Sequence, residues 1–410
     1  MSTHDSSIIL KNPSLIIFLI TRVFMAFSYQ MLTIAVRYQI VELNGKALDL
    51  GLLGLAEFLP MFMLTFIVGY VADRYNRKVI ISLCLITEAV GILLLAVRSY
   101  YGWINKGNIF AIIFFISIAY SFQGPPMQAL LPNIVSKEHF PQAAAWMASA
   151  FQFAVILGPA LGGVFYVLGP SVVYLTVVMM CITTSILVLF IKMTQSQSKR
   201  DPVNLKTLLA GLTFIESKPI VMGAISLDLF AVLFGGATAL LPLYAKNILK
   251  VGPMGLGLLQ AAPAVGALLM SLYLAKKPLK SSVGKKMFTA VIFFGVSTMI
   301  FAVSTSFILS LLILCVMGAA DVISVVIRST LIQLETPDEM RGRVSSVNLL
   351  FVGTSNQLGE FESGLMASLL SVVPAVLIGG LGTVVVVILW TKLFPQLLHA
   401  DKLKPSTDEA

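Results

Sequence analysis

Residues Gly69–Lys78 read GYVADRYNRK, and within this stretch a long apolar segment ends in a dense group of charges. The apolar run before the charges covers 49–72, and the next run begins at once and covers 79–98. A helix needs about 20 mostly apolar residues to cross the hydrocarbon core of a bilayer. A short charged turn between two such runs therefore predicts two membrane helices joined at one membrane surface.

The composition of the whole chain supports this interpretation. Of the 410 residues, 58% are hydrophobic and 11% are charged, whereas a soluble domain carries roughly 25% charged residues. Twelve runs are long enough to span a bilayer, and the ten-residue alternation of an outer-membrane barrel is absent. We therefore predict an all-α polytopic membrane protein with twelve transmembrane helices. The runs lie near 14–41, 49–72, 79–98, 109–133, 142–168, 171–193, 219–246, 253–275, 287–305, 307–333, 343–370 and 372–394.

Lys and Arg are distributed unevenly between the two sides of the predicted bundle. The side with the N-terminus carries 20, the other side carries 6, and Arg22 and Arg328 lie within helices. Positive loops stay in the cytoplasm, so we expect both termini to be cytoplasmic, in a bacterial inner membrane. The net charge of +9 follows from this topology, and no basic stripe with interleaved aromatic residues indicates nucleic-acid binding. The six opposite charges are Arg37, Lys46, Arg98, Lys106, Lys246 and Lys250.

The predicted helices fall into two sets of six. Residues 1–193 form an N-terminal half, 194–218 a cytoplasmic linker, and 219–410 a C-terminal half with a short tail. Matching residues recur at near-constant offsets of 203 and 201, which indicates an internal duplication of the kind that frames a central site in many transporters. The matched residues are Gly54, Glu57 and Pro60 with Gly257, Gln260 and Pro263, and Gly158 and Gly163 with Gly359 and Gly364.

The turn after the second predicted helix resembles the G-x-x-x-D-R-x-x-R-[KR] motif of the major facilitator superfamily. Its matching residues are Gly69, Asp73, Arg74, Arg77 and Lys78. A small residue permits close helix packing, and a carboxylate accepts charge-assisted bonds from arginine. The resemblance implies a cytoplasmic gate that locks the two halves together in one state. The alternative is a group of charges that only fixes the topology.

The fifth predicted helix contains GPALGG, residues Gly158–Gly163, which resembles the G-P-x-x-G-G motif of exporters in this superfamily. Proline removes a backbone hydrogen bond and bends the helix, while glycines make a closely packing face. The resemblance implies an antiporter motif formed by Gly158, Pro159, Gly162 and Gly163. Ordinary helix packing without a role in direction is the alternative.

The stretch 331–369 contains TPDEMRGRV and resembles the branch of the superfamily that includes the enterobactin exporter and macrolide-efflux proteins. The resemblance implies twelve helices in two pseudo-symmetric halves, with the first, fourth, seventh and tenth lining a central cavity. We accordingly expect the substrate cavity to contain a set of polar residues from these helices. They are Arg22, Tyr29, Gln30, Gln123, Gln128, Asp321 and Arg328.

Charged residues within membrane helices are costly and usually functional. Asp321 and Arg328 are seven residues apart and share a helix face, so we expect Arg328 to hold Asp321 ionised. Asp228 has no local partner, and a carboxyl group in a medium of low dielectric binds a proton more readily. We therefore predict Asp228 as the proton carrier, with Asp321 and Glu360 as the other candidates. For Glu57 and Glu88, structural and gating roles remain open.

These features favour a secondary transporter that exports a small amphiphilic molecule, a drug or a siderophore, in exchange for protons by alternating access. Import by the same fold is the alternative, and a membrane enzyme or sensor is a remote one. No phosphate-binding loop and no clustered nucleophile and base are present, so we expect no enzymatic activity, cofactor or metal. The expected partners are the substrate, protons and the bilayer, and the expected oligomeric state is a monomer.

Overall fold

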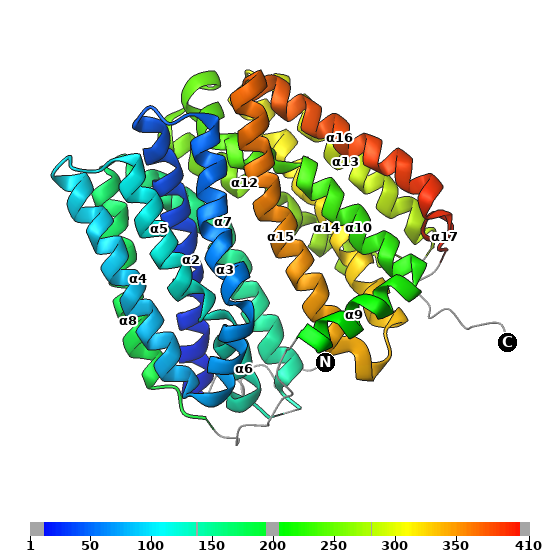
Figure 1. Cartoon of the computed structure of the whole chain (residues 1–410), viewed down its shortest axis with the longest axis horizontal. Coiled ribbons are helices and arrows are strands. Elements are labelled where there is room, and N and C mark those ends of the chain that lie inside the picture. Colours follow the sequence, from blue (N-terminus) through cyan, green and yellow to red (C-terminus); the bar gives the residue numbers. More distant parts are fainter. Residues whose placement is uncertain (1–11, 137, 194–204, 280, 402–410) are drawn as a thin grey trace. The chain divides into compact units, whose positions relative to one another are not determined.

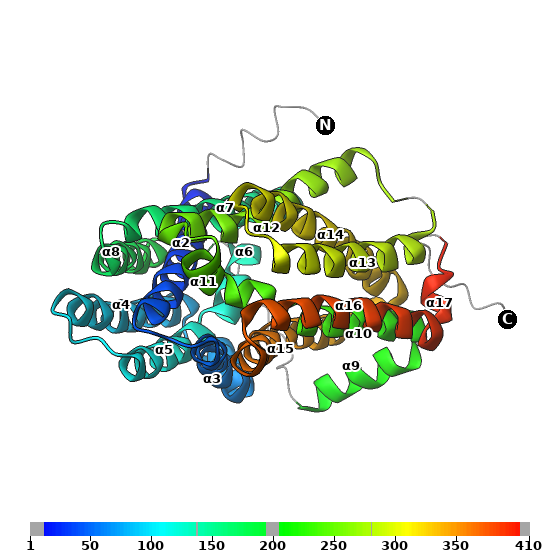
Figure 2. The same ribbon diagram turned by 90° about the horizontal axis from the view of Figure 1, so that it is seen from above.

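The computed structural model describes residues 12–136, 138–193, 205–279 and 281–401, and regular structure in these ranges is helical, without strands. Eleven helices are long and apolar enough to cross a membrane, so the chain is a multi-pass membrane protein, as predicted. Figures 1 and 2 show the helices in two views. The first set is α2 (Pro13–Glu42), α3 (Ala47–Arg74), α4 (Arg77–Tyr100), α5 (Lys106–Ser121), α6 (Gly124–Ile134), α7 (Phe140–Tyr166) and α8 (Pro170–Leu189).

The second set begins after the linker. It comprises α9 (Leu205–Ser217), α10 (Pro219–Phe234), α12 (Gly252–Lys276), α13 (Val283–Val303), α14 (Phe307–Glu335), α15 (Asp338–Leu370), α16 (Val372–Leu393) and α17 (Pro395–Leu398). Between α10 and α12 lie a 3₁₀ turn, Gly236–Leu240, then α11 (Leu241–Leu243) and a π-helical turn, Tyr244–Ile248. Proline within the first two residues starts many of these helices, because its missing N–H is unneeded there.

The twelfth predicted span is α15, which differs from the other eleven. It has 33 residues, a length of about 50 Å at the rise of an α-helix, so it is long enough to cross. It is too polar to qualify by composition, because it carries Asn348, Ser355, Asn356, Glu360 and Glu362. A helix of this polarity is stable in a membrane only where neighbouring helices cover its polar side.

The chain divides into two compact units. The first comprises Met1–Gly45, Ala56–Pro202 and Gly252–Ala261, and the second comprises Lys46–Leu55, Val203–Val251 and Ala262–Ala410. The predicted halves were continuous stretches of chain, whereas here the first turns of α3 group with the second unit and those of α12 with the first.

Equivalent helices make equivalent contacts within each unit. In the first unit the largest interfaces join α4 to α8 and α2 to α7, and α2 also packs on α8. In the second, α13 packs on α16, and α10 packs on α15 and α16. The matched glycines Gly163 and Gly364 each face a glycine: Gly163 faces Gly257 in one unit, and Gly364 faces Gly51, one helical turn before the matched Gly54, in the other. The internal duplication read from the sequence therefore appears in the packing of both units.

Two of the spans are interrupted. The fourth breaks at Phe122 and Gln123, between α5 and α6. The seventh breaks after α10, where an added Cβ on Gly236 would meet the carbonyl oxygen of Gly359 on α15. Broken helices expose backbone groups and are tolerated in membranes only where protein or water satisfies those groups. At these two interruptions, backbone polar groups must therefore be satisfied by neighbouring protein groups or by water.

Candidate functional site

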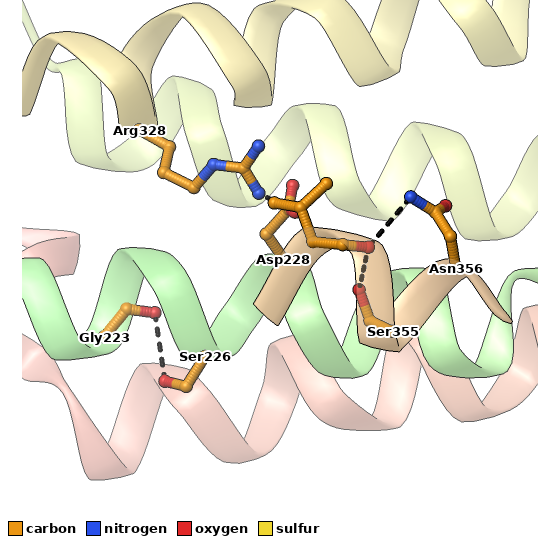
Figure 3. A network of polar contacts seen from close by, with 7 residues as sticks. Gly223, Ser226, Asp228, Arg328, Ser355 and Asn356 are labelled. Atoms are coloured by element: carbon orange, nitrogen blue, oxygen red, sulfur yellow. Dashed lines mark hydrogen bonds and ion pairs between the residues drawn. The ribbon is translucent and has the colours of Figure 1, made fainter. Parts of the chain in front are cut away.

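An ion pair joins two helices in the interior of the second unit. Arg328 on α14 contacts the carboxylate of Asp228 on α10 (Figure 3). Asp228 is 5% exposed and Arg328 is 6% exposed, so neither charge is solvated. Opposite charges in such a low-dielectric setting stabilise one another far more than they would in water. The two membrane helices are therefore connected by a charge-neutral link.

The expected pairing of Asp321 with Arg328 is wrong. A separation of seven residues places the two side chains on one face but about 10 Å apart along the axis, and the carboxylate of Asp228 is the one that Arg328 meets. Asp321 makes no ion pair or hydrogen bond with any described residue. Asp228, which was predicted to have no partner, is thus paired with Arg328. Asp321, which was predicted to be paired, has no ion-pair partner among the described residues.

Both acids line one small pocket in the second unit. Its walls include Asp228 from α10, Phe294 from α13, and Asp321 and Ser324 from α14. About 10 Å³ is open to water, which is roughly the space that one water molecule needs. The hydroxyl of Ser324 is buried and makes no hydrogen bond in the described part of the chain. The cavity therefore brings together one paired carboxylate, one unpaired carboxylate and one free hydroxyl.

Polar residues of α15 lie beside the ion pair. Ser355 and Asn356 both donate to the backbone carbonyl of Val352, at 3.1 and 2.9 Å (Figure 3). On α10, the Ser226 hydroxyl donates to the carbonyl of Met222 at 2.6 Å and accepts from the indole of Trp390 at 3.0 Å. Sequence analysis missed these serines and Asn356. The sequence signal that could have identified Ser355 and Asn356 is their position in α15, a polar stretch in an otherwise apolar half of the chain.

The two glutamates of α15 have different surroundings, as their two-residue separation predicts. A Cβ added to Gly54 would meet the side chain of Glu360, so Glu360 lies against the first turns of α3. Glu362 accepts a weak bond of 3.5 Å from the hydroxyl of Ser363. Neither residue lines the cavity that contains Asp228 and Asp321. Glu360 as a proton carrier therefore stays a prediction.

In the first unit, three predicted cavity residues of α2 contact residues of neighbouring helices. The guanidinium of Arg22 lies over the ring of Phe151, 5.8 Å from its centroid. Tyr29 stacks on Tyr120 of α5 with centroids 5.2 Å apart. The side chain of Gln30 packs against Gly158 of α7. These residues form an aromatic and basic surface, while Gln128 is exposed on α6.

The expected position of Gln123 in the substrate cavity is not what the structure shows. Gln123 is 2% exposed and donates its amide to the carboxyl group of Glu88 on α4. It sits at the break between α5 and α6, where a buried side chain is used to satisfy a buried acid. Glu88 is thereby hydrogen-bonded to a residue at this break, and the choice between a structural and a gating role for it stays a prediction.

Glu57 also has a partner. Its carboxylate lies 3.8 Å from the guanidinium of Arg37. Arg37 was placed among the loop charges by sequence analysis, but it lies within α2 and is 5% exposed. A buried arginine next to a carboxylate is a charge-compensated pair, so Arg37 contributes to the interior of the unit and not to a loop.

The charged turn after α3 binds backbone groups of its own unit. Arg77 donates to the carbonyl of Ala129 at 3.2 Å, and Lys78 donates to the carbonyls of Leu189 and Ile191 at 3.2 and 3.0 Å. Cations near helix C-termini satisfy carbonyls that lack a partner in the helix. The basic residues of this motif therefore bind the middle of α6 and the C-terminal end of α8.

Other parts of this motif are less constrained. Arg74 contacts the hydroxyl and ring of Tyr70. The close helix approach expected at Gly69 is absent from the described structure, because no atom lies within 4 Å of an added Cβ. The side chain of Asp73 lies outside the described residues. The gate role assigned to this motif stays a prediction.

Two glycines of the GPALGG motif, Gly158 and Gly162, face α2, whereas Gly163 faces Gly257 of α12. A Cβ on Gly162 would lie 3.1 Å from the backbone Cα of Met31, and one on Gly158 would lie 2.7 Å from the Cβ of Gln30. The motif thus produces the thin, close-packing face that its residue types predict. Pro159 lies inside α7. In the described ranges, no group of three or more His, Cys, Asp or Glu residues is placed to hold a metal.

Long membrane helices in duplicated units, with acids inside the bundle, are the features of a secondary transporter. The family model described as Major Facilitator Superfamily matches residues 18–359, and the chain belongs to this superfamily of transporters. Enterobactin exporter EntS of Citrobacter koseri is 24% identical over 413 residues, covering 98% of this chain and 97% of that protein. EntS of Escherichia coli strain K12 is 22% identical over 408 residues, covering 97% and 96%.

Solved structures share the fold at lower sequence identity. A bacterial homolog of the human lysosomal transporter Spinster, in an inward-facing conformation, superposes with a TM-score of 0.72 at 14% identity and covers 97% of both chains. A bacterial homologue of the iron transporter ferroportin gives a TM-score of 0.68 at 16% identity, covering 94% of this chain and 98% of that one. At these identities the likeness concerns the fold alone.

Proposed function

We propose that this transporter exports a small amphiphilic molecule, a siderophore or a drug, across a bacterial inner membrane by alternating access. Inward flow of protons drives the export. The likeness to the enterobactin exporters over nearly the whole chain and the GPALGG motif on α7 support the direction. The proposed unit is a monomer with both termini in the cytoplasm.

The observation that carries the proton coupling is the cavity between α10, α13 and α14. Of its two carboxylates, Asp228 is held by Arg328, whereas Asp321 has no charge partner among the described residues. An unpaired charge in the membrane interior is costly, and binding a proton removes it. We therefore assign the exchangeable proton to Asp321 and transfer the coupling role away from Asp228.

The ion pair can link the protonation state of Asp321 to the conformation of the second unit. When Asp321 is neutral, Arg328 has one carboxylate to satisfy, that of Asp228. When Asp321 loses its proton, a second carboxylate on the same helix face competes for the guanidinium. A change in the pairing of Arg328 alters the attachment of α14 to α10, and the acid thereby biases which state of the second unit is stable.

The test uses purified protein in vesicles with an imposed pH gradient. Wild-type protein should accumulate labelled enterobactin or the dye ethidium against its gradient. Asp321→Asn should abolish this accumulation and retain exchange of substrate at equal concentrations. Asn is similar in shape to protonated Asp but cannot bind or release a proton. Glu339→Gln, which removes an exposed acid at the start of α15, is the matched control and should behave as wild type.

Three results would contradict parts of this proposal. Accumulation by Asp321→Asn that equals wild type excludes Asp321 as the coupling acid and returns the role to Asp228 or Glu360. Accumulation in the same direction as the proton flow means import, with the same fold working in reverse. No dependence on the pH gradient in wild-type protein excludes proton coupling altogether.

A further inference from the structure

Arg22 is an uncompensated positive charge inside a membrane helix. It lies in α2 between Thr21 and Val23, within a span that runs from Pro13 to Glu42. No described carboxylate forms an ion pair with it, and its Nε atom is buried without a hydrogen-bond partner. The first unit therefore contains a guanidinium whose charge and donors are not fully used by the protein.

Other arginines in the spans show what compensation looks like in this chain. Arg37 on the same helix lies beside Glu57, and Arg328 pairs with Asp228. Intramembrane charges pair with one another or line substrate pathways. Arg22 has no paired carboxylate among the described residues, so a position on a substrate pathway is indicated. Its counter-charge would then come from the substrate.

Aromatic rings lie on the helices of this unit that carry or contact Arg22. Phe151 of α7 lies beneath the guanidinium at 5.8 Å, and Tyr120 lies on α5. Tyr120 is stacked on Tyr29 at an interplanar angle of 22°, and Tyr29 shares a face of α2 with Arg22 because the two are seven residues apart. The three side chains keep 36–44% of their surface exposed, so each has surface that a ligand can contact.

We propose that Arg22, Phe151 and the Tyr29–Tyr120 stack form a recognition site for a substrate group that is both aromatic and negatively charged. A guanidinium binds a carboxylate through two parallel charge-assisted hydrogen bonds. The tyrosine stack offers an offset-stacked or edge-to-face contact to the ring that bears this charge. The inference rests on the proposed transport function and adds the chemical class of the cargo.

The test measures equilibrium binding to the purified full-length protein in lipid nanodiscs. Three tritiated probes of similar size separate the two components: 2-naphthoate is aromatic and charged, 2-naphthamide is aromatic and neutral, and decahydro-2-naphthoate is charged without an aromatic ring. Wild-type protein should bind 2-naphthoate about tenfold more tightly than 2-naphthamide, a difference of about 1.4 kcal/mol, because the charge strengthens its hydrogen bonds to the guanidinium. It should also bind 2-naphthoate more tightly than decahydro-2-naphthoate.

Variants assign these preferences to the site. Arg22→Gln should lose the preference for the charged probe, Arg22→Lys should keep part of it, and Phe151→Leu should lower the preference for the aromatic probe. Arg98→Gln, which removes an exposed arginine in the last turn of α4, should change neither. Size-exclusion profiles and thermal unfolding show whether each variant is folded.

Equal affinity of wild-type protein for the three probes, or no measurable binding of 2-naphthoate, would overturn the inference. So would a charge preference that survives in Arg22→Gln. Transport distinguishes this failure from failure of the proposed function. If ethidium still accumulates with the pH gradient, export stands without this site; if the naphthoate preference is present but nothing is transported, the site stands without export.

Discussion

The guanidinium of Arg328 contacts the carboxylate of Asp228, and it does so between α14 and α10 rather than along α14. This contact decides the roles of three charges. Asp228 and Arg328 neutralise one another, and Asp321 lines the same cavity without a charge partner in the described structure. The proposed proton-binding role is therefore assigned to Asp321, which has no charge partner in the described structure, and not to Asp228.

Removing one member of this pair should destabilise the protein more than removing both. Asp228→Asn leaves Arg328 buried without a counter-charge, which costs about 3–5 kcal/mol, whereas two neutral residues of similar volume cost much less. Unfolding in detergent of Asp228→Asn, Arg328→Gln and the double variant completes a double-mutant cycle. Effects that simply add in the double variant would show that the pair is not coupled.

The topology prediction concerns the C-terminus. Sequence analysis places 20 Lys and Arg on the N-terminal side and 6 on the other, and one of those 6, Arg37, lies inside α2. A phosphatase reporter fused after Ala410 should therefore be inactive, since this enzyme folds only in the periplasm. The same reporter placed after Lys106, in the first turn of α5, should be active and serves as the positive control. Activity of the C-terminal fusion would reverse the orientation.

The motif at Gly69–Lys78 should show two separable effects. Lys78→Gln removes two bonds to the carbonyls at the end of α8 and should lower the free energy of unfolding by about 1–3 kcal/mol. Asp73→Asn should leave stability unchanged and slow transport strongly, as a gate requires. Normal transport by Asp73→Asn at equal expression would mean that the motif acts only as an anchor.

Two identical substitutions should have opposite outcomes. At Gly162 a new Cβ would lie 3.1 Å from the Cα of Met31, whereas at Gly69 the described structure leaves open space. Gly162→Ala should lower stability by about 1–3 kcal/mol through overpacking, and Gly69→Ala should be neutral or slightly stabilising through its higher helix propensity. Thermal unfolding of both variants provides the comparison, and equal losses would contradict the packing argument.

The spans were predictable from sequence because their signal is local. Apolar length identifies a membrane helix without any knowledge of its neighbours. Eleven of the twelve predicted runs fall on helices that are long and apolar enough to cross, and the twelfth falls on the polar helix α15. The close packing at the glycines of α7 was also predictable, because small residues in membrane helices commonly mark sites where two helices approach closely. Gly69 is the counter-example: the same reasoning placed a neighbour where none is seen.

The candidate site was less predictable because its contacts join different helices. Spacing along one helix shows which residues share a face, but the rotation of each helix against the next decides which charges meet. For that reason Asp321 and Arg328 looked like a pair, and Gln123 looked like a cavity residue when it is bound to Glu88. Arg22 was identified from charge alone, but the aromatic residue beneath it, Phe151, was not.

The polarity of α15 has a consequence for how the protein is made. Helices leave the ribosome one after another and enter the bilayer largely according to their own hydrophobicity. By that criterion α15 fails, whereas α16, which follows after Ser371, passes easily. A nascent chain that stops at Leu370 should leave α15 outside the bilayer, and extension through Leu393 should bring both helices in as a hairpin. Membrane insertion of the polar helix α15 should therefore depend on the synthesis of the apolar helix α16 that follows it.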